Sequence, residues 1–272
     1  MMLLMVNWSW SRIPHVSAIG DFDSLYSAIR AANAGGESAI TLTEDITLSG
    51  PLPVIRGKLT IDGDGHSISG DKQYRIFDVG GGRLTLSNVT LTEGKAPASE
   101  DGGAILLRSG GEAIVSDAAF INNEAENGGA LYLNYASAAI ANSSFADKRT
   151  HPIDGDGGAV KAQYSSITIA RSSFVANRSG SRGGAIDARD SEINITNSTF
   201  HKNRTDYAGG VLSALASDAT LTHLTMVSNW ARSEFGDAIF RAGGSVKLRN
   251  SIIVDSGINE DCVGGLSQIL AI

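Results

Sequence analysis

Apolar and polar residues alternate along most of this chain, in short runs separated by turns rich in Gly, Asn, Ser and Asp. In the clearest stretch, residues 183–203, the apolar side chains are Ile186, Ala188, Ile193, Ile195 and Phe200. A period of two is typical of β-strands, whereas a helix would repeat its apolar residues every three or four positions. The pattern therefore predicts three short strands in this stretch, joined by tight turns.

This stretch recurs at a nearly constant spacing between residues 102 and 256. Most copies open on Gly-Gly, and four of them close on an apolar residue followed three positions later by Asn. The openings begin at Gly102, Gly128, Gly157, Gly183, Gly209 and Gly236, at steps of 26, 29, 26, 26 and 27 residues. A fixed period in the twenties indicates that each copy is one supersecondary unit, which buries its apolar side against its neighbours.

The repeat predicts an all-β fold, a right-handed parallel β-helix of about eight coils in which each strand pairs with the same strand of the next coil. A leucine-rich repeat fits less well, because its consensus is missing and no unit contains a helical stretch. We expect an N-terminal segment and capping helix over 1–36, the β-helix over 37–256 and a degenerate tail over 257–272.

The capping helix is predicted from about residue 24 to 34. Leu25, Ile29 and Ala32 share one face of it, Asp23 or Ser24 can cap its start, and a glycine follows its end. Such a helix would cover the open end of the first coil, which otherwise exposes apolar core and unpaired strand edges.

Two columns of equivalent residues follow from the repeat. Phe120, Phe145, Phe174 and Phe200 recur at its spacing, so they should stack inside the coils. A second column is mostly asparagine, and we expect it to point inward and seal a corner by hydrogen bonds along the axis. Its members are Asn88, Asp117, Asn142, Arg171, Asn197, His223 and Asn250, of which we expect Arg171 and His223 to interrupt the ladder and point outward.

Charge and cysteine content narrow the function classes. The formal net charge is -7 and the lysines and arginines are scattered along the sequence, so a nucleic-acid partner is not expected. The single cysteine, Cys262, excludes an internal disulfide. The opening MMLLMVNWSW is too short to span a bilayer and is not a convincing signal peptide, which leaves either a cytoplasmic protein or, as we favour, a missing true beginning.

One short motif raises the question of a metal. Asp62 and Asp64 stand in an Asp-Gly-Asp-Gly run, where carboxylates could bind calcium, but turn chemistry explains the same residues. We therefore expect no cofactor, with calcium at these two residues as the alternative.

The Gly-Gly-Ala opening, the Phe-x-x-Asn close and the LTIDGDG entry together resemble the polymorphic outer membrane protein repeat and related pectate-lyase-like β-helices. The resemblance covers roughly residues 24–262. It implies the β-helix fold and an extracellular or cell-surface protein that is adhesive or acts on polysaccharides, with a polysaccharide or cell-surface glycan as partner. No C-terminal translocator barrel follows in this sequence, which puts outer-membrane anchoring in doubt.

The candidate site follows from the residues that the alternation directs outward on the first strand of each unit. On three adjacent coils these are Tyr132 with Asn134, Lys161 with Gln163, and Asp187 with Arg189. The longest step of the repeat contains an insertion, 147–156, which adds His151, Asp154 and Asp156 beside the same strands. Aromatic, amide and charged groups on a flat sheet suit an extended sugar chain, while the alternative is a solvated sheet face with a Lys161–Asp187 pair.

Several functions remain open on this face. The first is glycan or surface binding without catalysis, and the second is a polysaccharide lyase acting on a uronate polymer. In the lyase, Tyr132 or His151 would be the base and Lys161, Arg189 and Gln163 would hold the carboxylate, with the pKa of the Tyr132 phenol expected to be lowered by the Lys161 charge. A hydrolase would need two carboxylates from Asp154, Asp156 and Asp187, and a purely structural spacer would bind nothing.

Overall fold

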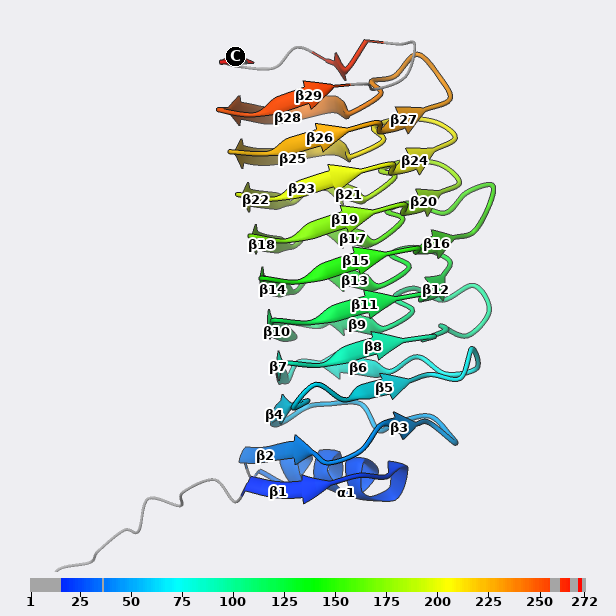
Figure 1. Ribbon diagram of the computed structural model, residues 1–272, viewed down its shortest axis with the longest axis vertical. Coiled ribbons are helices and arrows are strands. Elements are labelled where there is room, and N and C mark those ends of the chain that lie inside the picture. Colours follow the sequence, from blue (N-terminus) through cyan, green and yellow to red (C-terminus); the bar gives the residue numbers. More distant parts are fainter. Residues whose placement is uncertain (1–15, 36, 255–259, 265–268, 271–272) are drawn as a thin grey trace, which may run out of the picture.

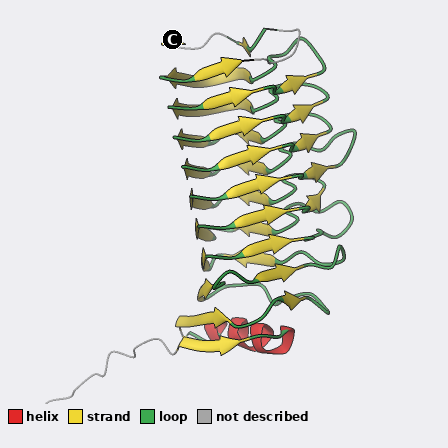
Figure 2. Cartoon of the chain, viewed as in Figure 1, coloured by secondary structure: helices red, strands yellow, loops and turns green. Residues whose placement is uncertain are grey.

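The computed structural model describes residues 16–35, 37–254, 260–264 and 269–270, and within them the chain winds into a solenoid of about nine stacked coils (Figure 1). Every strand pairing is parallel, because each strand pairs with its equivalent one coil away. Figure 2 shows strands on all sides of the stack and one helix beneath the first coil. This arrangement confirms the predicted parallel β-helix.

A regular coil contains four strands, one more than the three expected, because a two-residue strand closes each turn. The first strands are β6 (Phe77–Gly80), β9 (Ile105–Arg108), β13 (Leu131–Asn134), β17 (Val160–Gln163) and β21 (Ile186–Arg189). The second strands are β4 (Lys58–Asp62), β7 (Arg83–Ser87), β10 (Glu112–Ser116), β14 (Ser137–Ala141), β18 (Ser166–Ala170) and β22 (Glu192–Thr196).

The other two sides of the coils are shorter. The third strands are β3 (Ile46–Thr47), β5 (Ser67–Ser69), β8 (Thr90–Thr92), β11 (Ala119–Ile121), β15 (Ser144–Ala146), β19 (Ser173–Val175), β23 (Thr199–His201), β26 (Thr225–Val227) and β29 (Ile252–Val254). The fourth are β12 (Glu124–Ala125), β16 (Arg149–Thr150), β20 (Arg178–Ser179), β24 (Arg204–Thr205) and β27 (Trp230–Ala231).

Towards the C-terminus the first and second strands merge into the long strands β25 (Leu212–Thr222) and β28 (Ile239–Arg249). In the segment expected to be a degenerate tail, β30 (Cys262–Val263) and β31 (Ile269–Leu270) still pair with β28. The sheet ladder therefore continues past residue 257.

The helix α1 (Phe22–Asn33) covers the first coil, as expected, and buries Leu25, Ile29 and Ala32. Its N-cap is Asp21, not Asp23 or Ser24, because the Asp21 carboxylate accepts a hydrogen bond from the backbone N–H of Ser24 at 2.8 Å. The helix is preceded by β1 (Val16–Ile19), which pairs with β2 (Glu37–Leu42). The capping unit is therefore a strand as well as a helix.

The phenylalanine column lies inside the coils as predicted. Phe120, Phe145, Phe174 and Phe200 are fully buried, with successive ring centroids 4.5, 4.6 and 4.8 Å apart and planes within 10° of parallel. The rings stack because the third strands of neighbouring coils pair each phenylalanine directly with the next one.

Replacing Phe174 with alanine should lower the free energy of unfolding by about 3 to 4 kcal/mol, because it leaves a cavity between two stacked rings. Urea titration followed by circular dichroism would measure the change. Val175→Ala is the control on the same strand, since the Val175 side chain is 37% exposed and should cost under about 1 kcal/mol. Equal losses in the two variants would show that the column contributes no special stability.

The predicted asparagine ladder was wrong in its direction. Its seven members all lie at left-handed corners with φ between 48° and 55°, and their side chains are exposed, so the outward direction expected for Arg171 and His223 alone holds for the whole column. Some still bond along the axis on the surface, as Asn142 does to Asp117 at 3.2 Å. The left-handed backbone conformation at the corner turns the side chain outward, so the alternation of the preceding strand does not continue through it.

An internal amide ladder exists at the Phe-x-x-Asn close instead. Asn123, Asn177, Asn203 and Asn229 are buried, and Asn203 shows their bonding. Its Nδ2 donates to Phe174 O at 3.0 Å, and its Oδ1 accepts from the backbone N–H and the Nδ2 of Asn177. The equivalent position of one coil holds Lys148, which is fully buried and donates from Nζ to Ala146 O at 2.6 Å.

Candidate functional site

The first-strand face is not the exposed sheet that the alternation suggested. Tyr132, Lys161 and Asp187 lie on adjacent coils in register, as expected, but they are 8%, 4% and 0% exposed. The Gly-Gly opening is the physical reason. At Gly157, with φ of 63°, a Cβ would stand 2.2 Å from Val160 O, so the turn folds back closely over the strand that follows it.

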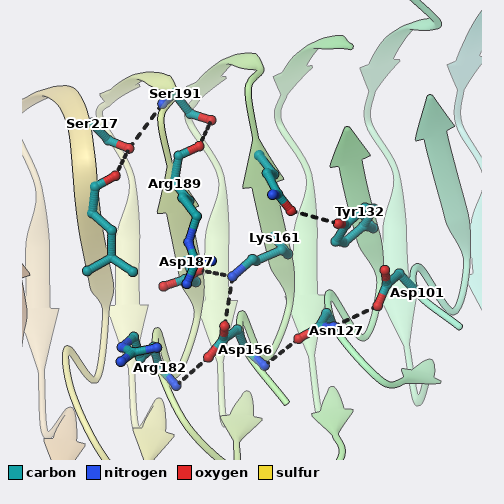
Figure 3. A network of polar contacts seen from close by, with 12 residues as sticks. Asp101, Asn127, Tyr132, Asp156, Lys161, Arg182, Asp187, Arg189, Ser191 and Ser217 are labelled. Atoms are coloured by element: carbon teal, nitrogen blue, oxygen red, sulfur yellow. Dashed lines mark hydrogen bonds and ion pairs between the residues drawn. The ribbon is translucent and has the colours of Figure 1, made fainter. Parts of the chain in front are cut away.

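The turn residues that fold back form a polar network over the buried column (Figure 3). Lys161 Nζ donates to Asp156 at 2.8 Å and also to Asp187, so one ammonium joins two buried carboxylates. Asp156 accepts a second hydrogen bond from the backbone N–H of Arg182 at 3.1 Å, and its own N–H donates to Asn127 at 2.8 Å. The network therefore fixes the end of the inserted loop to the coils on either side.

Burial dominates the electrostatics of this network. It raises the pKa of Asp187, while the Lys161 charge opposes that shift. One carboxylate oxygen of Asp187 and the hydroxyl of Ser213 are buried without a hydrogen bond of good geometry in the described structure. The enclosed network holds its charges in place. Tyr132, Lys161 and Asp187 are too little exposed to bind a sugar chain.

The expectation for the Tyr132 phenol was wrong in sign. Burial, followed by the negative charge of Asp101, raises the pKa of Tyr132 to about 12. Its hydroxyl donates to Gln163 Oε1 at 3.1 Å. A phenol of this pKa, already committed to an amide, is poorly suited to abstract a proton at neutral pH.

The remaining residues of the predicted site are divided between surfaces. Asn134, Gln163 and Arg189 are half-buried at the second outward position, and Asn134 Oδ1 is among the buried atoms that lack a partner. In the inserted loop, His151 and Asp154 are exposed, and His151 Nδ1 lies 3.8 Å from Glu126. The depression that His151 lines contains none of Tyr132, Lys161 and Arg189. The structure therefore does not bring the proposed lyase residues together.

A groove that the sequence reasoning missed lies one residue beyond the predicted site, at the corner between the first and second strands. It has a volume of about 1000 Å³ and runs across coils along the axis. Its most prominent feature is Tyr135 and Tyr164, whose rings stack with centroids 4.8 Å apart and planes 16° from parallel. Both rings are largely outside the protein, at 61% and 43% exposed.

Backbone geometry places these rings in the groove. Tyr135, Tyr164 and Asp190 all have φ near 50°, in the left-handed corner of successive coils, so their side chains project outward. The signal was present in the sequence, since the two tyrosines are one repeat step of 29 residues apart. The alternation of the strands gave no information about a corner that belongs to neither strand.

The groove floor is polar and acidic. Its carboxylates are Asp190, Glu192 and Asp218, and a single lysine, Lys247, lies at one end. Hydroxyl-bearing residues, among them Ser137, Ser166 and Thr220, and the amide of Asn194 also line it. Stacked aromatic rings beside carboxylates and hydroxyls can bind the faces and the hydroxyl groups of a neutral sugar chain.

The Asp-Gly-Asp-Gly turn has the geometry of an ordinary turn. The Asp62 carboxylate accepts from the backbone N–H of Asp64 and from Asn88, both at 3.1 Å, and Asp64 has a φ of 47°. Among the described residues, no group of three or more His, Cys, Asp or Glu side chains is arranged to hold a metal ion. The expectation of no cofactor, with calcium at this turn as the alternative, stays a prediction.

Comparison with known families agrees with the fold. Residues 60–267 match the family model described as a right handed beta helix region, so the chain belongs to this family. Neither a search of curated proteins nor a search of solved structures returns a match. Across the described part of the chain, no helix is long and apolar enough to cross a membrane.

Proposed function

We propose that this protein is an exported or surface-associated β-helix that binds an extended, neutral glycan without cleaving it. The observation that carries the proposal is the exposed tyrosine stack, Tyr135 on Tyr164, in a polar groove. An exposed pair of large rings has an apolar surface to bury, and sugar rings present apolar faces of matching size. The groove crosses several coils, which suits a chain of sugars better than a single one.

The extracellular or cell-surface location belongs to the same proposal. It rests on the resemblance of the repeat to that of polymorphic outer membrane proteins, whose members are mostly exported. A glycan-binding groove on a rigid solenoid would serve adhesion to a cell surface, because a groove that crosses several coils would offer several sugar subsites in one line.

A polysaccharide lyase is the alternative, and the arrangement of its proposed residues argues against it. Lys161 is sequestered by Asp156 and Asp187, and the raised pKa of Tyr132 disfavours the phenolate that a base would require. The carboxylates in the groove would repel a uronate polymer there, so the groove itself suits a neutral chain. Binding without catalysis therefore accounts for more of the geometry.

Removing the stacked rings tests the proposal. In a Tyr135→Ala, Tyr164→Ala variant, binding to neutral polysaccharides such as xylan, mannan and amylose should weaken about 30-fold or more, because stacking of each ring contributes about 1 kcal/mol beyond its buried area. Affinity electrophoresis against the panel would find a ligand, and calorimetry with an oligosaccharide of it would give the dissociation constant.

The control is Tyr26→Ala on the capping helix, since Tyr26 is similarly exposed at 37% and lies outside the groove. It should leave affinity unchanged. An unchanged affinity in the double variant, or no binding to any neutral glycan, would contradict the proposal. Release of unsaturated products from polygalacturonate, seen as ultraviolet absorbance, would instead support the lyase.

A further inference from the structure

The fourth strands of the coils carry a line of arginines. Arg149, Arg178 and Arg204 are directly paired in register on β16, β20 and β24, and all three side chains are exposed. These short strands follow one another along the right-hand side of the stack, away from the β14, β18 and β22 side (Figure 1). Although the lysines and arginines look scattered along the sequence, the steps of 29 and 26 residues between these three are those of the repeat.

The arginines are only partly neutralised by the protein. Arg178 lies 3.4 Å from Asp206, and Arg204 stacks over the Trp230 ring with its guanidinium carbon 4.0 Å from the ring centroid. Within the described ranges, Arg149 makes no ion pair, although Glu124 stands next to it in register on β12. Like charges on directly opposed strand positions repel, so three in a row on an acidic chain mark a surface suited to an anionic ligand.

A cleft adjoins one end of this line. It has a volume of about 640 Å³ and lies between the segment at Ala96 and Pro97 and the inserted loop at His151 and Pro152, with Arg149 and Arg178 in its lining. At the other end of the line, β24 pairs with β27, which places Trp230 next to Arg204. In register the line therefore ends at Glu124 on β12, beside the cleft that Glu126 also lines, and at the Trp230 ring on β27.

We propose that this surface, Arg149, Arg178 and Arg204 with Trp230 and the adjoining cleft, binds an acidic polysaccharide laid along the solenoid axis. Neighbouring coils repeat at about 4.8 Å, close to the length of one pyranose in an extended chain, so one guanidinium is available for each carboxylate or sulfate. Phosphates of a single-stranded nucleic acid are spaced more widely and would need several stacking rings, whereas this surface has one. The inference is independent of the neutral-glycan groove, because the two surfaces share no residue.

The test measures polygalacturonate binding by calorimetry at low and high salt. An Arg149→Ala, Arg178→Ala, Arg204→Ala variant should bind at least about 30-fold more weakly, since each exposed charge contact contributes a modest part of the affinity. The matched control, Arg30→Ala, Arg56→Ala, Lys58→Ala, removes the same charge from exposed positions near the first coil and should change affinity less than about twofold. Circular dichroism would establish that both variants keep the fold.

Each outcome decides the proposal. A loss of polygalacturonate binding in the Arg149→Ala, Arg178→Ala, Arg204→Ala variant alone, with weaker binding of oligo(dT) than of polygalacturonate, supports it. Equal loss in both variants would show a general charge effect, and tighter binding of oligo(dT) would indicate a nucleic-acid surface, so either would overturn it, as would no binding at all. The Tyr135→Ala, Tyr164→Ala variant should retain polygalacturonate binding, which separates this site from the neutral-glycan groove.

Discussion

Replacing Lys161 with methionine should lower the free energy of unfolding by about 5 kcal/mol at pH 7, because the variant leaves two buried carboxylates without their shared cation. Asp156 and Asp187 both bind the Lys161 ammonium, and the three side chains are at most 12% exposed. Methionine has a similar length to lysine, so the loss reports the charge and not a cavity. Urea unfolding of both proteins would measure it.

The pH dependence of the loss separates electrostatics from packing. Without Lys161, the main force opposing the raised pKa of Asp187 is gone, so the folded variant should take up a proton more readily than its unfolded chain. A group with a raised carboxyl pKa stabilises the fold relatively more at low pH. The deficit of the variant should therefore shrink as the pH falls from 7 to 4, and a deficit of constant size would contradict the charge explanation.

Two further variants test whether the loss comes from the unpaired buried carboxylates. Adding Asp156→Asn and Asp187→Asn to Lys161→Met should recover most of the stability, since removing a whole buried ionic group costs far less than removing one partner. Lys95→Met is the matched exposed control, because Lys95 lies 3.6 Å from Glu124 on the surface and the pair should be worth under about 1 kcal/mol.

The repeat made the fold predictable, because a period near 26 residues with internal alternation leaves few architectures. The Phe174 column followed from the same spacing, and the capping helix followed from the apolar face and the cap signals of its own short segment. The burial of Tyr132 could not be read in this way. It depends on how far the Gly-Gly turn folds back over the next strand, and that is a property of backbone conformation.

The corners were the other limit of the sequence reasoning. Asn142 was expected inside and lies outside, while Tyr135 was overlooked at an equivalent left-handed position. Both errors came from extending the strand alternation through a residue that belongs to no strand. The line of arginines, in contrast, is predictable from the sequence, because Arg149, Arg178 and Arg204 recur at the steps of the repeat.

Lys148 is the other buried lysine, and replacing it with asparagine should raise the free energy of unfolding by about 3 to 5 kcal/mol at pH 7. It occupies an asparagine position of the internal ladder, between the coils of Asn123 and Asn177. A lysine side chain has no acceptor, so it cannot take the hydrogen bonds that Asn203 Oδ1 accepts from Asn177. Asparagine would supply both the Nδ2 donor and the Oδ1 acceptor that the other ladder positions have.

The same substitution should flatten the dependence of stability on pH. Burial lowers the pKa of Lys148 from 10.5 to about 6, so between these values the unfolded chain binds a proton that the folded chain does not. Stability should therefore rise with pH across this window, by about 1.4 kcal/mol per pH unit from this group alone, and level off below about pH 6. Lys148→Asn removes the group, so its advantage should be largest near pH 6 and should shrink towards pH 10, where only the contribution of the restored hydrogen bonds remains.

Urea unfolding at pH 6, 7, 8 and 9 would measure both proteins, with Lys247→Asn as a control that removes an exposed lysine from β28. The control should shift stability by under about 0.5 kcal/mol at every pH. An advantage of Lys148→Asn that stays constant with pH would assign the gain to the restored ladder and reject a neutral buried amine. A loss of stability would show that the ammonium finds better solvation inside the coil than its single carbonyl partner supplies.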